Sequence, residues 1–168
     1  MNKRFFAFGC SYTNWPHPTW ADFIGINFEE YYNYGKAGAC NTYIANSFIE
    51  ANNEYQFNNE TDIIFISMSG FGRFSYMEKQ EKTELDARLY DWQTNGDTLF
   101  TNNEGHPEIS KLIGNKIFNY NWAAYNSWIS FITMKNILVE KKINHKIIMS
   151  INNKHYLTNF NILNISDD

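Results

Sequence analysis

The first residue along the chain with the chemistry of a nucleophile, Ser11, stands directly after a short apolar run and a glycine. The run from Arg4 to Phe8 is aromatic and apolar and is closed by Gly9, a pattern typical of a buried strand that ends in a tight turn. In an α/β domain such a turn exposes a side chain to the ligand crevice. Ser11 is therefore a candidate nucleophile, and the alternative is a plain turn before a helix.

Two more loops with polar residues follow predicted strands. One runs from Gly35 to Asn41, after a strand predicted over Glu29 to Asn33, and the other runs from Ser69 to Ser75. Because ligands bind beyond the carboxyl ends of parallel strands, all three loops are expected to border one crevice. Asn41 and Arg73 are the expected substrate-binding residues there. Arg73 would suit an anionic or sugar substrate, with a solvated arginine as the alternative.

Other chemistries find less support in the residues. Cys10 would need an Arg six residues later to act as a low-molecular-weight phosphatase, and Pro16 stands there instead. Cys10 and Cys40 supply too few ligands for a zinc site and are expected to be buried, inert thiols. No phosphate-binding or dinucleotide-binding glycine motif occurs. We therefore expect no metal and no cofactor.

The predicted elements that carry these residues alternate between strand and helix. A helix is predicted from Thr19 to Ile24, with Thr19 as its N-cap and Trp20, Phe23 and Ile24 facing the sheet. A second helix is predicted from about Asn41 to Glu54. The continuous apolar run from Asp62 to Met68 indicates a strand covered on both faces.

The second half of the chain is less regular. Residues 76–110 are polar without a sustained period and are expected to be an insertion or excursion. A long helix is predicted from Lys116 to Lys142, a fourth strand from Lys146 to Ile151 and a fifth from Phe160 to Ile165. The residues expected to give the long helix its apolar spacing are Phe118, Trp122, Tyr125, Ile129, Ile132 and Leu138. The alternation predicts a single α/β domain over residues 1–168, a three-layer sandwich with a flavodoxin-like parallel sheet of four to five strands and helices on both faces.

Two of the loops resemble conserved blocks of the SGNH (GDSL-type) hydrolases. The segment from Phe8 to Thr13 resembles the first block, with Cys10 where Asp is usual. The segment from Asn33 to Gly38 resembles the second. The resemblance implies that Ser11 is the nucleophile and that the backbone N–H groups of Ser11 and Gly38 form an oxyanion hole, which glycine suits because it lets the backbone approach the reacting oxygen.

The third and fourth blocks of that family are altered. The usual Gly-x-Asn-Asp is here Ser67-Met68-Ser69-Gly70, so that Ser69 takes the place of the oxyanion-hole Asn. The Asp-x-x-His that supplies the general base is absent, and its nearest counterpart is Asn152-Asn153-Lys154-His155. By resemblance His155 is the expected base, with a surface histidine as the alternative. The weaker candidates for the base are His17, His106 and His145.

Three functions follow as expectations. The first is a serine esterase of SGNH type that acts on a small ester, such as an acetyl or short acyl group on a carbohydrate. The second is an inactive SGNH-like module that binds a glycan or a partner. The third is one half of a split hydrolase, since the chain stops early for the family and is expected to be incomplete at its C-terminus. The sequence does not indicate an oligomeric state.

The charge and the hydropathy of the chain indicate which classes of partner and which cellular compartment to expect. The net charge of −4 and the absence of a basic segment argue against nucleic acid as a partner. The apolar stretch after Met1 ends at Gly9, which is too short for a signal peptide or a membrane span. We therefore expect a cytoplasmic protein that does not bind membranes.

Overall fold

Four parallel strands form the central sheet of the computed structural model, which describes residues 3–71, 73–77, 92–95, 112 and 119–149. The strands are β1 (Arg4–Gly9), β2 (Glu30–Gly35), β3 (Asp62–Met68) and β6 (Asn144–Met149). Their order is β2-β1-β3-β6, and each neighbouring pair is parallel. The predicted α/β fold with a parallel sheet is confirmed.

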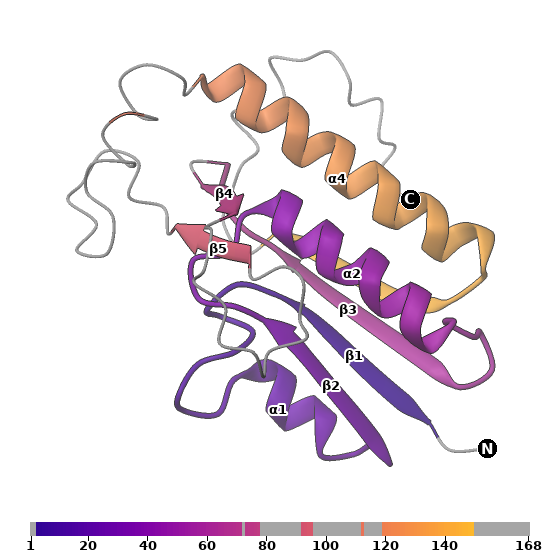
Figure 1. Cartoon of the computed structure of the whole chain (residues 1–168). Coiled ribbons are helices and arrows are strands. Elements are labelled where there is room, and N and C mark those ends of the chain that lie inside the picture. Colours follow the sequence, from indigo (N-terminus) through magenta and orange to yellow (C-terminus); the bar gives the residue numbers. More distant parts are fainter. Residues whose placement is uncertain (1–2, 72, 78–91, 96–111, 113–118, 150–168) are drawn as a thin grey trace, which may run out of the picture.

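Helices cover both faces of this sheet (Figure 1). Helix α1 (Trp20–Gly25) lies against one face, while α2 (Asn41–Tyr55) and α4 (Tyr120–Glu140) lie side by side on the other. Successive side chains of β1 point to opposite faces of the sheet. Phe5 and Ala7 belong to the core below α1, whereas Phe6 and Phe8 belong to the core below α2 and α4. All four side chains are fully buried, as expected for a strand inside a parallel sheet.

The predicted inward face of α1 is wrong at one residue. Thr19 is the N-cap, as expected, and its backbone N–H donates to the Asp22 carboxylate (2.7 Å). Trp20 and Ile24 pack on the core, but Phe23 is 66% exposed. Ala21, which is fully buried, takes the inward position. A helix of six residues is too short for its apolar spacing to define one face.

The predicted apolar spacing of α4 is wrong at three residues, whereas Leu138 is buried as expected and Phe118 lies outside the described residues. Trp122, Tyr125 and Ile129 are exposed by 45% or more. The buried positions are mostly small, because α4 packs closely on α2, and a small side chain lets two helices approach. The buried residues of α4 are Ala123, Ala124, Ser127, Ser130, Met134 and Leu138.

A short two-stranded ribbon lies beyond the carboxyl ends of the sheet strands. β4 (Phe74–Met77) and β5 (Trp92–Asn95) pair antiparallel. Both overlap residues 76–110, so the segment predicted as an insertion or excursion contains strand residues, and its role as an insertion stays a prediction. The fourth strand of the sheet begins two residues before its predicted start at Lys146. The predicted fifth strand, Phe160 to Ile165, lies outside the described residues.

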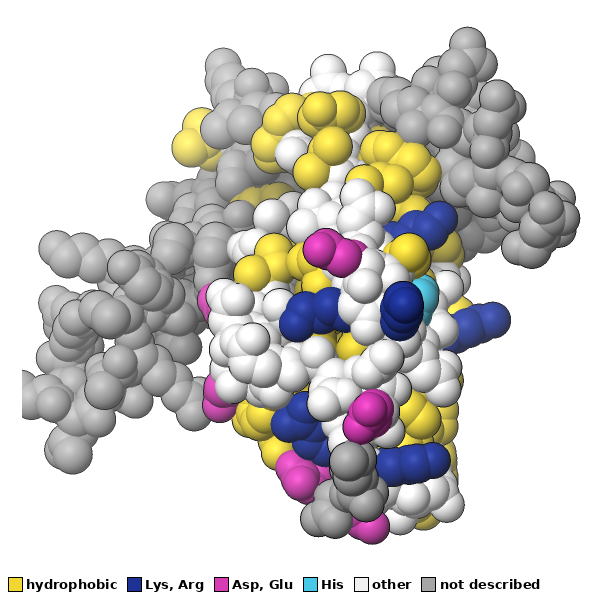
Figure 2. All heavy atoms as spheres, turned by 90° about the vertical axis from the view of Figure 1, so that its right-hand side faces the viewer, with side chains coloured by type: hydrophobic (Ala, Val, Ile, Leu, Met, Phe, Trp, Pro, Cys, Tyr) yellow, Lys and Arg dark blue, Asp and Glu magenta, His cyan; other side chains and the backbone are white. Residues whose placement is uncertain are grey.

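The opposite end of the molecule, where the strands begin, carries charges of both signs (Figure 2). Arg4 at the start of β1 forms a two-pronged ion pair with Asp62 at the start of β3, at 2.7 and 2.8 Å. Basic and acidic side chains alternate over the described part of this face rather than forming a patch of one sign. None of the described helices is both long and apolar enough to cross a lipid bilayer.

Candidate functional site

Ser11 lies in a tight turn at the carboxyl end of β1. The N–H groups of Thr13 and Asn14 both donate to the carbonyl oxygen of Cys10, at 2.9 and 3.2 Å, which closes the turn around Ser11. The Ser11 side chain is partly exposed, whereas Cys10 is 1% exposed and belongs to the core. The turn therefore buries the residue before the serine and leaves the serine itself partly exposed at the carboxyl edge of the sheet.

The Ser11 turn packs closely against two glycines, Gly9 and Gly35. A Cβ at Gly9 would overlap the hydroxyl of Thr13, and a Cβ at Gly35 would lie 2.7 Å from the Cβ of Asn14. Gly9 and Gly35 are paired in the register of β1 and β2. Both strands therefore end without side chains where the turn packs against them, and any larger residue would displace it.

Hydrogen bonds hold the same turn to the neighbouring elements. The carbonyl oxygen of Thr13 accepts from the Thr19 hydroxyl (2.6 Å) and from the Asn33 amide (2.9 Å). The Asn14 amide donates to the carbonyl oxygen of Gly35 (3.0 Å). The turn is thereby fixed to the N-terminus of α1 and to the end of β2, which is the rigidity that a positioned nucleophile requires.

The carboxylate of Asp22 supports this arrangement from α1. It accepts from the N–H of Thr19 and from the hydroxyl of Tyr31 (3.0 Å). These hydrogen bonds, that of the Thr19 N–H first, hold the pKa of Asp22 below its ordinary value. Burial, and then the same carboxylate, raise the pKa of Tyr31. Asp22 is therefore ionised and Tyr31 neutral at neutral pH.

Gly38 occupies a turn between β2 and α2. The N–H of Ala39 donates to the carbonyl oxygen of Lys36 (3.0 Å), and Gly38 has a φ of 77° at the third position of this turn. A positive φ there is the mark of a type II turn, which favours glycine. Among the described residues the Gly38 N–H has no acceptor.

The Ser11 and Gly38 turns leave neighbouring strands at the same edge of the sheet. The N–H of Lys36 donates to the carbonyl oxygen of Gly9 (3.1 Å), so the two loops are joined where they begin. The structure thus brings these two predicted site residues to adjacent loops, as the spacing of the two segments predicts.

Ser69 and Asn41 are engaged in fixing the loops to one another. The N–H of Ser69 donates to Asn41 Oδ1 (2.7 Å), and Asn41 Nδ2 donates back to the Ser69 carbonyl oxygen (2.9 Å). The Ser69 hydroxyl, fully buried, donates to the carbonyl oxygen of Ala39 (2.8 Å). Asn41 Nδ2 also donates to Ser127 Oγ in α4 (3.0 Å). In this structure the Ser69 hydroxyl therefore donates its proton to the Ala39 carbonyl oxygen and not toward Ser11.

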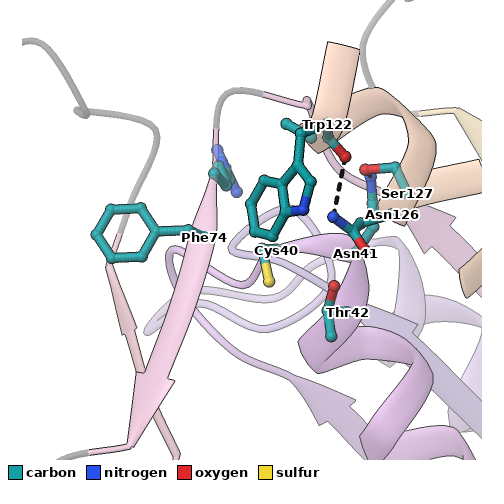
Figure 3. A pocket seen from close by; sticks show the side chains of 9 residues that line it. Cys40, Asn41, Thr42, Phe74, Trp122, Asn126 and Ser127 are labelled. Carbon is teal, nitrogen blue, oxygen red and sulfur yellow. Dashed lines mark hydrogen bonds between the residues drawn. The ribbon is translucent and has the colours of Figure 1, made fainter. Parts of the chain in front are cut away.

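A cavity of about 160 Å³ opens between α2, the start of β4 and α4. We call it the α2–α4 pocket. It is lined by residues 40–42, by Arg73 and Phe74, and by four residues of α4: Trp122, Ala123, Asn126 and Ser127. Figure 3 shows the Trp122 indole between Phe74 on one side and Asn41 and Thr42 on the other. Asn41 and Arg73 thus share a cavity, and neither Ser11 nor Gly38 lines it.

Trp122, Asn126 and Ser127 are pocket residues that sequence reasoning missed. The sequence indicates Trp122 only as part of the apolar spacing of the long helix, and its side chain is 56% exposed. The signal available in the sequence is the polar pair at 126 and 127, one helical turn after the tryptophan, on a helix otherwise rich in apolar residues.

Neither of the described histidines hydrogen-bonds to Ser11. His17 is exposed in the loop before α1, with its ring 6.4 Å from that of Trp15. His145 is the second residue of β6, at the opposite edge of the sheet, where its Nδ1 lies 2.7 Å from the carbonyl oxygen of Ile143. His106 and His155 lie outside the described residues.

Both cysteines are buried, neither forms a disulfide, and the Cys40 Sγ accepts a hydrogen bond from the Tyr43 N–H (3.4 Å). Within the described part of the chain, no three metal-ligating side chains come together. No protein-family model matches the chain, and no curated protein matches it in sequence. Whatever is said of its function therefore depends on the geometry described above.

Proposed function

We propose that this protein is a serine hydrolase of SGNH type that cleaves a small ester, with Ser11 as its nucleophile. One observation carries the proposal: Ser11 occupies a rigid turn at the ligand edge of the sheet, hydrogen-bonded through its loop to the strand that leads into the Gly38 turn. A positioned hydroxyl beside backbone N–H donors is the arrangement that acyl transfer needs.

In the proposed reaction Ser11 Oγ attacks the ester carbonyl carbon and gives its proton to a general base. The carbonyl oxygen becomes an oxyanion, which accepts hydrogen bonds from the N–H groups of Ser11 and Gly38. Collapse of the tetrahedral intermediate expels the alcohol, protonated by the same base, and leaves an acyl group on Ser11. Water then hydrolyses the acyl-enzyme. Each backbone donor contributes roughly a hundredfold or more to the rate.

The base in this proposal is His155, on the strength of the resemblance around Asn152. In the family such a histidine takes the proton of the nucleophile, and without one a serine site keeps only the residual acceleration of its oxyanion hole, roughly a thousandfold over water. His155→Ala is therefore expected to abolish ester turnover almost as fully as Ser11→Ala.

Ser69 and Asn41 act in this proposal as positioning residues. Since the Ser69 hydroxyl donates to the carbonyl oxygen of Ala39, it holds the residue that follows Gly38. Asn41 fixes Ser69 in turn through both of its amide atoms. The oxyanion hole then consists of two backbone donors, and Ser69 secures the second of them instead of donating to the substrate.

The substrate that we propose is a small ester, such as an acetyl or short acyl group on a carbohydrate. The direct test is turnover of p-nitrophenyl acetate by the wild type, by Ser11→Ala and by Ser130→Ala. Ser130 is a matched control, because its hydroxyl only donates to the Asn126 carbonyl oxygen within α4. We expect Ser11→Ala alone to lose activity, by on the order of a thousandfold or more. Equal turnover by wild type and Ser11→Ala would refute the proposal.

A non-catalytic binding module is the second candidate, and specific observations favour it. The Ser69 hydroxyl is engaged by Ala39, neither described histidine reaches Ser11, and the α2–α4 pocket is not lined by Ser11. This candidate predicts a protein that hydrolyses no ester and binds a glycan or a protein partner with the same affinity after Ser11→Ala. A glycan array probed with the wild type and with Ser11→Ala distinguishes the two candidates.

A further inference from the structure

Helix α4 has a second, outward face besides the one that packs on the rest of the domain. The residues of this face are spaced alternately four and three positions apart, which is the spacing of positions a and d in a coiled-coil heptad. They are Tyr125, Ile129, Ile132, Asn136 and Val139, and we call them the α4 seam. In this frame all six residues that are buried in α4 fall at positions b, c and f. The domain therefore holds α4 by a different face of the helix.

The α4 seam is open to solvent. Tyr125, Ile129 and Val139 are exposed by 45% or more, Asn136 is exposed and Ile132 is partly exposed. A continuous row of exposed apolar side chains on a folded domain marks an interaction surface. Because the row follows a helix at heptad spacing, the partner that it fits best is another helix.

A single asparagine interrupts the apolar seam, at position a. In a parallel two-stranded coiled coil, position a of one helix faces position a of the other, so Asn136 would meet Asn136 of a second copy. Each amide group can both donate and accept a hydrogen bond. One polar residue at such a position fixes the register and favours two strands, at some cost in stability.

The charges of α4 match the same arrangement. Lys135 and Glu140 are the two charged residues of the helix, and they stand at positions g and e beside the seam. In a parallel pair, position g lies beside the position e that is five residues further along the other helix. Lys135 of each copy would therefore face Glu140 of the other. Within the described part of the chain neither residue has an oppositely charged partner, and Lys135 lies over the Phe131 ring (5.9 Å).

We propose that two copies of this chain dimerise through the α4 seam, as a parallel pair of helices around a two-fold axis. A self-complementary patch of this kind gives a closed dimer. The seam is short for an isolated coiled coil, but α4 is already held as a helix by its packing on the domain, so association need not order it. The dimer does not require Ser11 and is independent of the proposed hydrolysis.

The first test is sedimentation equilibrium of the wild-type protein from about 1 to about 200 µM. We expect a monomer–dimer equilibrium with a dissociation constant on the order of 10 µM or tighter. This measurement needs no variant to fold. A monomer at every concentration, or an assembly larger than a dimer, would overturn the proposal.

A charge placed in the seam locates the interface. Ile129→Asp is expected to weaken dimerisation at least about a hundredfold, because each copy would bury an unpaired carboxylate. Ile26→Asp is the matched control, since Ile26 is 78% exposed and lies outside α4, and it should leave dimerisation unchanged. Circular dichroism checks that both variants are folded. Equal dimerisation of the two variants would contradict an interface on α4.

Charge reversal tests the parallel arrangement. Lys135→Glu or Glu140→Lys alone would replace both ion pairs with like-charge pairs, so each is expected to weaken dimerisation about tenfold or more. The double reversal restores opposite charges and should return the dissociation constant to within about threefold of the wild type. Both side chains are exposed, so no variant removes a buried contact within the domain. Unchanged dimerisation in the single variants, or no recovery in the double variant, would overturn the proposal.

Discussion

Asn41 shows how much of the site is held by single side chains. Its amide group bonds to the backbone of Ser69 in both directions and to the hydroxyl of Ser127, while the residue itself is 2% exposed. One side chain therefore joins the loop after β2, the loop after β3 and helix α4. Removing it would leave a buried N–H, a buried carbonyl oxygen and a buried hydroxyl without their partners.

Asn41→Ala is accordingly expected to lower the free energy of unfolding by about 2–4 kcal/mol. Asn53→Ala is the control on the same helix, because Asn53 is exposed, and it should change stability by no more than about 0.5 kcal/mol. Urea unfolding followed by circular dichroism measures both. A loss in Asn41→Ala no larger than in Asn53→Ala would show that the hydrogen bonds of Asn41 contribute little.

At the scale of elements, the short helix α1 depends on its cap. It has six residues, fewer than an isolated helix needs, and its first turn is held by the hydrogen bond from the Thr19 N–H to Asp22. The same cap anchors the Ser11 turn, because the Thr19 hydroxyl donates to the carbonyl oxygen of Thr13. Protonation of Asp22 should therefore weaken both α1 and the turn.

The pH dependence follows from the lowered pKa of Asp22. Its pKa in the folded protein lies below the ordinary value of 3.8, so the ionised carboxylate stabilises the fold above that value. This contribution is lost as the pH falls through the lowered pKa. Asp22→Asn should therefore be less stable than wild type at neutral pH, and the difference in unfolding free energy should close as the pH falls below 3.8 and through the lowered pKa. Denaturant unfolding at several pH values measures the gap, and a gap independent of pH would contradict this assignment.

The packing of α4 on α2 depends on small side chains. Ala124 is 2% exposed on α4, so a leucine in its place would have to displace the groups that cover it. Ala124→Leu is expected to cost about 1–3 kcal/mol of unfolding free energy and to change the α2–α4 pocket. Asn136→Leu, at an exposed position of the same helix, adds a similar apolar side chain without that cost. Thermal melts of the two variants compare them, and equal melting temperatures would argue against close helix packing.

At the scale of the whole molecule, the sheet was the part that the sequence could predict. The bounds of β3 agree with the prediction. Its continuous apolar run is typical of a parallel strand that is covered on both faces. Thr19 was predictable as a cap from local chemistry alone. The inward face of α4 could not be predicted from apolar spacing. Small side chains, Ser127 and its alanine neighbours, are buried there because they let the two helices approach each other closely. The pairing of β4 with β5 depends on contacts distant in sequence, which no local pattern contains.

The candidate site likewise has residues whose positions could be predicted from the sequence and others whose contacts could not. Ser11 and Gly38 could be placed at one edge because parallel strands end together, and the type II turn explains why glycine stands at 38. The hydrogen bond from the Ser69 hydroxyl to the Ala39 carbonyl oxygen could not be predicted, because it joins two loops that are distant in sequence. Whether His155 serves Ser11 stays a prediction.

The most direct test of the central proposal is covalent labelling of Ser11. A fluorophosphonate reacts with an activated serine, and mass spectrometry of the digested protein identifies the residue that carries the adduct. Ser11→Ala and Ser130→Ala are labelled in parallel. We expect one adduct, on Ser11, in the wild type and in Ser130→Ala, and none in Ser11→Ala. An unlabelled wild type, or an adduct that persists in Ser11→Ala, would contradict it.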